Sequence, residues 1–191
     1  MKICIVAEGS YPYVVGGVST WTHNLIRSFP EHEFTIVSVL ADRSQRGQFQ
    51  FELPENVWEA HELYLNDTDW RNGKRRKTRL NKTEFQALRS LVLNRDVEWE
   101  AIFQLFQEKI GSVNDLLMGP DFLKIVTEYY QIYYNQLVFT DFLWMIRSIY
   151  LPMFLALQTE VPQADVYHCI CTGYAGILGS MGKFFHGGRM L

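Results

Sequence analysis

The chain has 191 residues, of which 48% are hydrophobic and 15% aromatic, so it is long enough for one well-buried globular domain or one and a half small ones. Its formal net charge of -3 at pH 7 argues against nucleic acid as a partner, because such partners usually select a basic face. The high aromatic content indicates either large helix interfaces or apolar surface that serves another purpose.

The first forty residues carry the pattern of a strand, a helix and a second strand. The run KICIVA (2–7) is short, apolar and rich in Ile and Val, as expected of a parallel strand buried on both faces. FTIVSVL (34–40) has the same character, and the helix between the two strands closes at Pro30. This βαβ unit implies a parallel sheet with a right-handed crossover. Apolar residues at spacings of three and four define the expected helix face: Val18, Trp21, Leu25, Ile26 and Phe29.

A third strand is predicted over 56–65, and the character of the chain then changes. Seven Lys or Arg residues lie between Arg71 and Lys82. We interpret this basic run as a solvated linker, with anionic lipid headgroups or an acidic partner as alternatives. RNA is less favoured, because no aromatic stacking residues are interleaved there.

Nearly everything from Thr83 to Thr159 has helical periodicity, which predicts a large helical insertion over 66–160 in a Rossmann-like α/β domain formed by 1–65 and 161–191. Within the insertion, residues 137–157 have the length of a membrane span. They include Asp141, Arg147 and Pro152, and a charged residue at the centre of a bilayer costs about 2.5–3.5 kcal/mol. We therefore expect no membrane span here, but a buried helix or helix pair broken near the proline.

The sheet is expected to resume with a strand over 164–171 and a helix rich in small residues. Four glycines recur every three residues along that helix: Gly173, Gly176, Gly179 and Gly182. Close packing of the helix on its sheet explains such a bare face, and the start of the helix lining a ligand cleft is a compatible alternative. The last two residues resemble the beginning of another strand, so we expect the chain to be truncated.

Two features favour a reducing cytoplasm. Cys4, Cys169 and Cys171 all lie in apolar runs and are interpreted as buried free thiols. The apolar run after Lys2 stops at Glu8, which is too short for a secretory signal. No CxxC pair or spaced His/Cys cluster accompanies the cysteines, so no metal is expected.

Ligands of open parallel sheets bind beyond the carboxyl ends of the strands, where this chain has two loops, 8–17 and 168–173. Glycine at Gly16 and Gly17 lets backbone N–H groups approach an anion, and the following helix adds the positive end of its dipole. A plain turn would also explain two adjacent glycines. The loop matches neither GxGxxG nor GxxxxGK[ST].

Several side chains at this edge are candidates for chemistry. His168 is suited to bind a sugar hydroxyl or stabilise developing charge, or is a structural histidine. Glu8 is a candidate general base or hydroxyl acceptor, or a carboxylate that caps a loop. Ser19 and Thr20 are cap-region hydroxyls in the simplest interpretation. The candidate substrate- and phosphate-binding set is Gly16, Gly17, Val18, Ser19, Glu8, Thr172 and Gly173.

The stretches AEGSYPYVVGGVSTW and ADVYHCICTGYAGILG resemble the amino-terminal domain of glycosyltransferase family 4 enzymes, in particular the Pel-type (PelF-like) exopolysaccharide glycosyltransferases. The resemblance covers residues 1–40 and 164–191 by motif, whereas the helical insertion matches only in length and character. It implies a GT-B architecture and retaining transfer of a hexose from a nucleotide sugar, such as a UDP-sugar, to a polysaccharide acceptor, without a metal or other cofactor.

The resemblance also implies roles for particular residues. Gly16 and Gly17 match the loop that approaches the donor phosphates, and His168 matches the first histidine of a DxxHxH-like strand end. Ile170 stands where many members place the second histidine. The second domain, which holds most nucleotide-sugar contacts, is absent from this chain.

We therefore expect the acceptor-side domain of a cytoplasmic glycosyltransferase that is inactive alone, held peripherally at the inner membrane by membrane-bound polysaccharide export proteins. The alternative is a non-enzymatic scaffold whose insertion docks on such partners. That alternative predicts an exposed apolar patch made of Tyr129, Tyr130, Tyr133, Tyr134, Phe139, Phe142 and Trp144.

Overall fold

A computed structural model describes residues 1–66 and 79–191 of the chain. Most of the basic run lies outside these described residues, and only Arg79 and Lys82 of it fall within them. The chain divides into two compact units, one of Met1–Asp67 with Thr159–Leu191 and one of Thr68–Gln158. We call them the sheet unit and the helical unit and describe each by itself.

The sheet unit is built on five strands that pair in parallel in the order β3-β2-β1-β4-β5. This arrangement confirms the predicted α/β, Rossmann-like fold. Strands β1 and β2 coincide with the two continuous apolar runs, because a strand buried on both faces has no polar alternation, whereas most of β3 is exposed. Their bounds are β1 Lys2–Glu8, β2 Glu33–Leu40, β3 Val57–Tyr64, β4 Val166–Cys169 and β5 Arg189–Met190.

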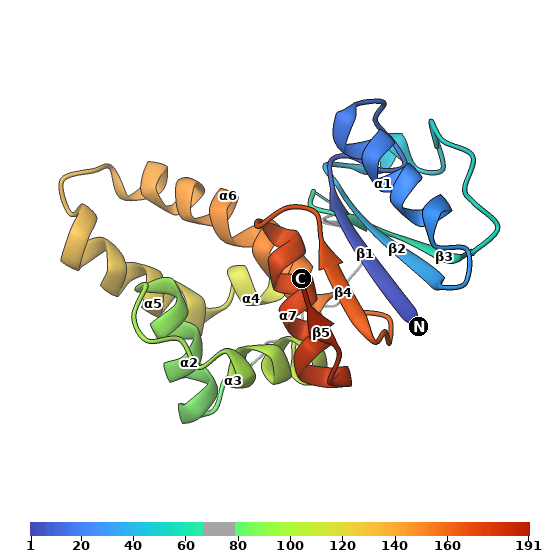
Figure 1. Ribbon diagram of the computed structural model, residues 1–191. Helices are drawn as coiled ribbons and strands as arrows, with labels where there is room; N and C mark the ends of the chain where they lie inside the picture. Colours follow the sequence, from blue (N-terminus) through green and yellow to red (C-terminus); the bar gives the residue numbers. More distant parts are fainter. Residues whose placement is uncertain (67–78) are drawn as a thin grey trace. The chain divides into compact units, whose positions relative to one another are not determined.

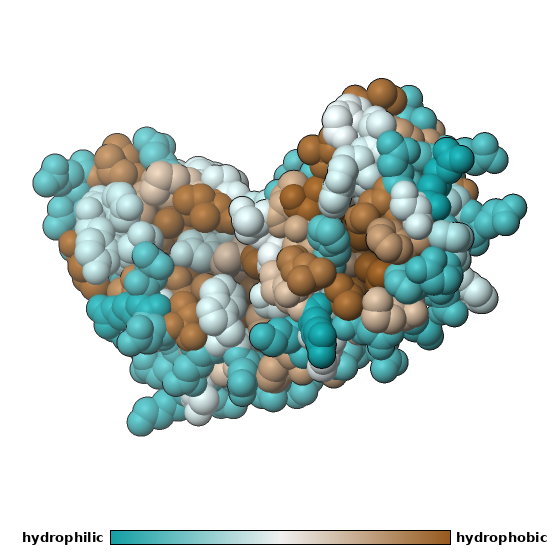
Figure 2. All heavy atoms as spheres, viewed as in Figure 1, coloured by the Kyte–Doolittle hydropathy of each residue, from teal (hydrophilic) through white to brown (hydrophobic). Residues whose placement is uncertain are grey.

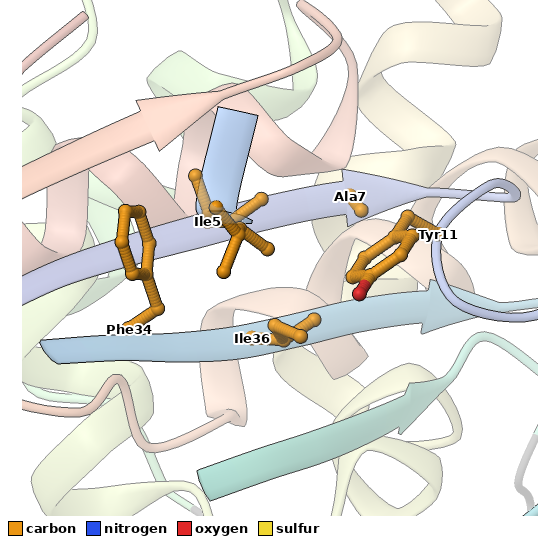
Figure 3. Close-up of a cluster of buried hydrophobic side chains, with 6 residues drawn as sticks. Ile5, Ala7, Tyr11, Phe34 and Ile36 are labelled. Atoms are coloured by element: carbon orange, nitrogen blue, oxygen red, sulfur yellow. The ribbon is translucent and has the colours of Figure 1, made fainter. Parts of the chain in front are cut away.

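One face of the sheet packs against α1 (Gly17–Ser28). In Figure 1, α1 lies over β1 and β2. The core of this face combines strand residues such as Ile5 and Ile36 with Ile26 of α1, all of them fully buried. Figure 3 shows how Tyr11, from the loop after β1, closes this cluster beside Ile36. The cluster therefore fixes both the helix and the loop that precedes it.

The other face packs against α7 (Tyr174–His186), whose glycines permit a close approach. A Cβ added at Gly182 would lie 2.4 Å from the Tyr167 ring, and one at Gly179 would lie 2.4 Å from the Cys169 Sγ. These distances leave no room for a side chain. Close packing therefore accounts for this part of the glycine stripe, whereas a Cβ at Gly176 would meet nothing within 4 Å.

The helical unit packs several short helices around an apolar core. Phe106, Phe122 and Phe154 are all but fully buried at its centre, and the Phe154 ring contacts the other two. Its first described helix starts with a capping box between Asn81 and Glu84. Its elements are α2 Lys82–Val92, α3 Trp99–Gln104, η2 Leu105–Lys109, α4 Val113–Leu117, α5 Pro120–Tyr129, η3 Tyr130–Tyr134 and α6 Phe139–Gln158; a further short helix, η1 Arg43–Gln45, belongs to the sheet unit.

Helix α6 corrects the expectation of a buried helix broken at a proline. It runs continuously through Pro152. The proline removes one backbone donor, which frees the carbonyl of the exposed Ser148 to be hydrated. By length and composition α6 is able to span a membrane, yet only 33% of its most apolar window is buried. Helix α6 thus has a buried side and an exposed side, and Trp144, Ser148 and Ile149 lie on the exposed one.

The prediction of an exposed aromatic patch is wrong for its central residues. Phe142 is fully buried, and the rings of Tyr130 and Tyr134 pack on it with centroids 5.3 and 5.1 Å away. These rings pack against one another because this removes their apolar surface from water. Of the patch, Tyr133 and Trp144 remain exposed, by 58% and 63%.

Candidate functional site

The candidate site lies where β1 and β4 end side by side. The strand order changes direction between these two strands, which makes this the topological switch point of the sheet. The loop after β1, residues 9–16, and the loop after β4, residues 170–173, leave the sheet at the same edge. The two loops singled out in the sequence therefore do flank one position.

The amino terminus of α1 is open. Gly16 caps the helix in an extended conformation, no side chain caps the first turn, and no acidic residue lies in it. A Cβ at Gly16 or Gly17 would meet nothing within 4 Å, and neither glycine has the left-handed φ that favours this residue. Neither backbone conformation nor internal packing therefore requires glycine here. The first-turn N–H groups, including those of Gly17 and Val18, remain oriented as an anion site would need them.

The amino terminus of α7 is filled instead by the carboxylate of Glu8. The backbone N–H of Ala175 donates to Glu8 Oε2 over 3.4 Å. A Cβ at Gly173 would come within 2.8 Å of the same oxygen. Burial and the nearby Glu8 charge raise the pKa of Tyr174. Glu8 thus takes a capping position that complements the helix dipole, and the two loops are joined through it.

His168 lies on β4 beside Ile5 of β1 and faces the α1 side of the sheet. Its ring meets the edge of the Trp21 indole at a centroid distance of 5.7 Å and an interplanar angle of 70°. Burial lowers the pKa of His168, so the imidazole is neutral at neutral pH and offers one donor and one acceptor nitrogen. His168 and the start of α1 are therefore brought together through Trp21.

Trp21 is a site residue, although its spacing predicted that it would lie on the buried face of the helix. Trp21 is 50% exposed and Val18 51%, whereas the buried residues of α1 are Ser19, Thr22 and Ile26. The helix is thus rotated from the expected orientation, with small polar residues toward the sheet. Its largest side chain is left to cover His168 at the edge of the site.

The remaining candidates differ in their exposure. Thr172 is exposed in the loop after β4, whereas Ser19 is on the buried side of α1. Ile170 packs against the apolar core cluster of the α1 face. Its N–H also donates to Val6 O over 3.0 Å. The position two residues after His168 therefore packs against the apolar core.

The loop of residues 9–16 is anchored by tyrosines that the sequence did not single out. The hydroxyl of Tyr11 lies 3.2 Å from His23 Nδ1, and burial raises the pKa of Tyr11 to about 12. The hydroxyl of Tyr13 donates to Glu62, as does that of Tyr64. Large aromatic residues in a glycine-containing loop were the signal that such anchoring exists.

The Glu62 carboxylate is the centre of this second anchor. It also accepts a hydrogen bond of 3.0 Å from the N–H of Gly47, and Arg46 approaches it to 3.9 Å. Burial by itself would raise the pKa of Glu62, but the hydrogen bonds and the Arg46 charge outweigh it and hold that pKa below its usual value. The loop of residues 9–16 is consequently held in one arrangement before any ligand binds.

Over residues 1–66 and 79–191, no group of three or more His, Cys, Asp or Glu side chains is arranged to hold a metal ion. The three cysteines are free thiols. Burial, and to a smaller extent the neighbouring Cys169, raises the pKa of Cys4 to about 12. A thiol with such a pKa is not a nucleophile at neutral pH.

The fold and the switch point define a Rossmann-like domain with an open helix terminus at its candidate site. Over residues 1–191 the chain matches the family described as "Domain of unknown function (DUF3492)", and it belongs to that family. This family model does not identify a glycosyltransferase family. No protein of curated function and no solved structure matched the chain.

Proposed function

We propose that the chain is the acceptor-side, amino-terminal domain of a retaining, nucleotide-sugar-dependent glycosyltransferase that acts in exopolysaccharide biosynthesis in the cytoplasm. The resemblance of its two glycine-containing loops to those of glycosyltransferase family 4 supplies the reaction. The resemblance implies a two-domain architecture, in which a second domain would complete the cleft and hold the nucleotide. The 191-residue chain is then inactive alone.

The observation that carries this proposal is the open start of α1 at the switch point. Gly16 and Gly17 have no internal reason to be glycine, since a Cβ there would meet empty space. A diphosphate that approaches the helix terminus would fill that space, and the terminus supplies N–H donors and a positive dipole without a metal. Glu8 keeps the second helix terminus at this edge occupied, which leaves α1 as the anion-binding one.

The remaining residues fit a transfer reaction at this edge. In that reaction the bond between the anomeric carbon and the diphosphate breaks, and a glycosidic bond forms to an acceptor hydroxyl, which gives up its proton. A neutral His168 is able to hydrogen-bond a sugar hydroxyl through its donor or acceptor nitrogen. Trp21 beside it presents a half-exposed apolar ring to the same space.

The test is release of UDP from UDP-glucose and related donors by the protein extended through the natural end of its gene. We expect turnover by the extended protein, none by residues 1–191, and a loss of at least about tenfold in Gly17→Val because its side chain blocks the phosphate. Gly111→Val is the matched control, since its Cβ also meets nothing within 4 Å. Full activity of a folded Gly17→Val would refute the role given to the glycines.

A scaffold role is the second candidate, and the outward face of α6 favours it. Val138, just before α6, and Trp144 and Ile149 within it are 66%, 63% and 53% exposed. Figure 2 shows hydrophobic side chains at the surface over this helix. An exposed apolar face of this kind usually marks an interaction site. In this proposal it docks on membrane-bound proteins of polysaccharide assembly.

This candidate is tested by the distribution of the full-length protein between the membrane and soluble fractions of its own cells. Trp144→Ser with Ile149→Ser is expected to move the protein to the soluble fraction. Trp99→Ser, in an equally folded background, serves as control because Trp99 is also exposed but lies on α3. An unchanged distribution of the double variant would remove this candidate.

A further inference from the structure

A second region of the sheet unit has the chemistry of a binding site, and it lies away from the switch point. A hollow of about 990 Å³ lies between α1 and the segment of residues 50–56 that leads into β3. A smaller one of about 420 Å³ lies beside the first residues of β1, β2 and β3. Trp58 and Glu33 line both hollows. The two therefore meet at Trp58, near the amino ends of the strands.

Trp58 is held at this position by an irregularity in the sheet. Phe34 pairs with Val57 and Thr35 pairs with Glu59, so that Trp58 is an extra residue without a partner on β2. Such a bulge redirects a side chain, and here it leaves the indole 72% exposed. A bulge or a charge is enough to protect a sheet edge from pairing. Protection of the edge therefore does not require a tryptophan at this position.

The groups around Trp58 are hydrogen-bonding groups with an excess of negative charge. Six glutamates line the two hollows, against one lysine and one arginine. Among the described residues no hydrogen bond or ion pair engages the side chains of Glu52 and Glu55, and both residues are exposed. The amide of Gln50 lies in the same wall. This charge disfavours an anionic ligand, while carboxylates and amides accept hydrogen bonds from hydroxyl groups.

The wall that carries these groups is fixed in place. The side-chain amide of Asn56 donates to the backbone carbonyls of Ile26 and Phe29, over 3.0 and 3.1 Å. Phe51 packs its ring against Tyr11 and His23 at centroid distances of 5.4 and 5.3 Å. The segment is thus attached to the end of α1 and to the core, so its carboxylates face a preformed hollow.

We propose that these two hollows form a binding site for an uncharged saccharide chain, with one sugar ring stacked on the Trp58 indole. The apolar C–H face of a pyranose covers the indole, and its hydroxyls donate to Glu52, Glu55 and Gln50. Because the hollows continue on either side of Trp58, the site takes more than one sugar unit. It is separate from the α1 terminus and binds saccharide without a nucleotide.

The experiment is calorimetric titration of the 191-residue chain with chitopentaose and cellopentaose, and with trigalacturonate as an anionic probe. We expect at least one uncharged oligosaccharide to bind and trigalacturonate not to bind. Trp58→Ala should weaken binding by about tenfold, as loss of an aromatic anchor does. Trp58→Phe should retain part of the affinity, and Glu52→Gln with Glu55→Gln should weaken it by a smaller factor.

Two controls keep the outcome interpretable. Trp144→Ala removes a similarly exposed indole from the helical unit and should leave binding unchanged. Gly17→Val should also leave it unchanged, which separates this site from the function proposed above. Failure of both uncharged oligosaccharides to bind, equal binding by Trp58→Ala, or equal binding of trigalacturonate would each overturn the proposal.

Discussion

The carboxylate of Glu8 lies against Gly173 so closely that a Cβ on the glycine would come within 2.8 Å of Oε2 and 3.2 Å of Cδ. The two residues end β1 and open α7, and they are 165 positions apart in the chain. The contact joins the two loops of the switch point. It also explains why the helix can begin without a capping side chain of its own.

This contact predicts a coupling between the two positions. Gly173→Ala should lower the free energy of unfolding by about 1 kcal/mol, because the methyl group displaces a carboxylate that caps a helix. In a Glu8→Ala background the same substitution should cost much less. A double-mutant cycle by urea unfolding measures the coupling. Additive effects would show that the two side chains do not interact.

The glycine stripe of α7 predicts opposite effects at two of its positions. Gly182→Ala should destabilise the domain by about 2 kcal/mol or more, since the new methyl group would enter the buried Tyr167 ring. Gly176→Ala should stabilise it by about 0.5–1 kcal/mol, because its Cβ meets open space and alanine favours a helix. Thermal and urea unfolding of the two variants make the comparison. Equal effects would mean that α7 does not pack this closely.

Much of this fold could be predicted from the sequence, because buried parallel strands are continuous apolar runs that stand out from their surroundings. The orientation of α1 could not be predicted. Periodicity pointed Val18 and Trp21 inward, but the small residues Ser19 and Thr22 are the ones buried. A hydrophobic pattern identifies an apolar stripe on a helix. It does not show that a helix packed closely on the sheet buries small side chains rather than large ones.

The candidate site was predictable in its location and not in its contacts. The rule for parallel sheets placed the loops after β1 and β4 at one edge. The capping of α7 by Glu8 and the cover of His168 by Trp21 depend on side chains far apart in sequence. Trp58 lies in a strand as predicted, but its bulge could not be predicted, because a bulge depends on pairing with β2 and leaves no local signal.

The Glu62 anchor predicts a loss of stability in acid. Its hydrogen bonds hold the folded-state pKa of Glu62 below the ordinary value of 4.5, so the stabilisation is present above that pH and disappears as the pH falls through the folded-state pKa. Glu62→Gln should cost about 1–3 kcal/mol at pH 7, because charged hydrogen bonds to two tyrosines are weakened. It should also flatten the acid limb of the stability curve. An acid limb as steep as that of the wild type would exclude Glu62 as its source.

The last prediction concerns the proton on His168. Its folded-state pKa lies below the ordinary 6.5 because the ring is partly desolvated. Stability from this group is therefore present above pH 6.5 and is lost as the pH falls through the lower, folded-state pKa. Trp21→Ala uncovers the ring and should bring the pKa of His168 back toward 6.5. An NMR titration of the imidazole C–H resonance measures the change.

A control for this titration is available in the same domain. Burial and the nearby Arg27 charge also lower the pKa of His23. Its ring contacts Tyr11 and Phe51 rather than Trp21. Trp21→Ala should leave the His23 titration unchanged, so that only the resonance of His168 moves. Should both resonances move together, the substitution has loosened α1 as a whole. A His168 resonance that stays in place would mean that the indole does not shield the imidazole, and the candidate site would then lose its link between β4 and α1.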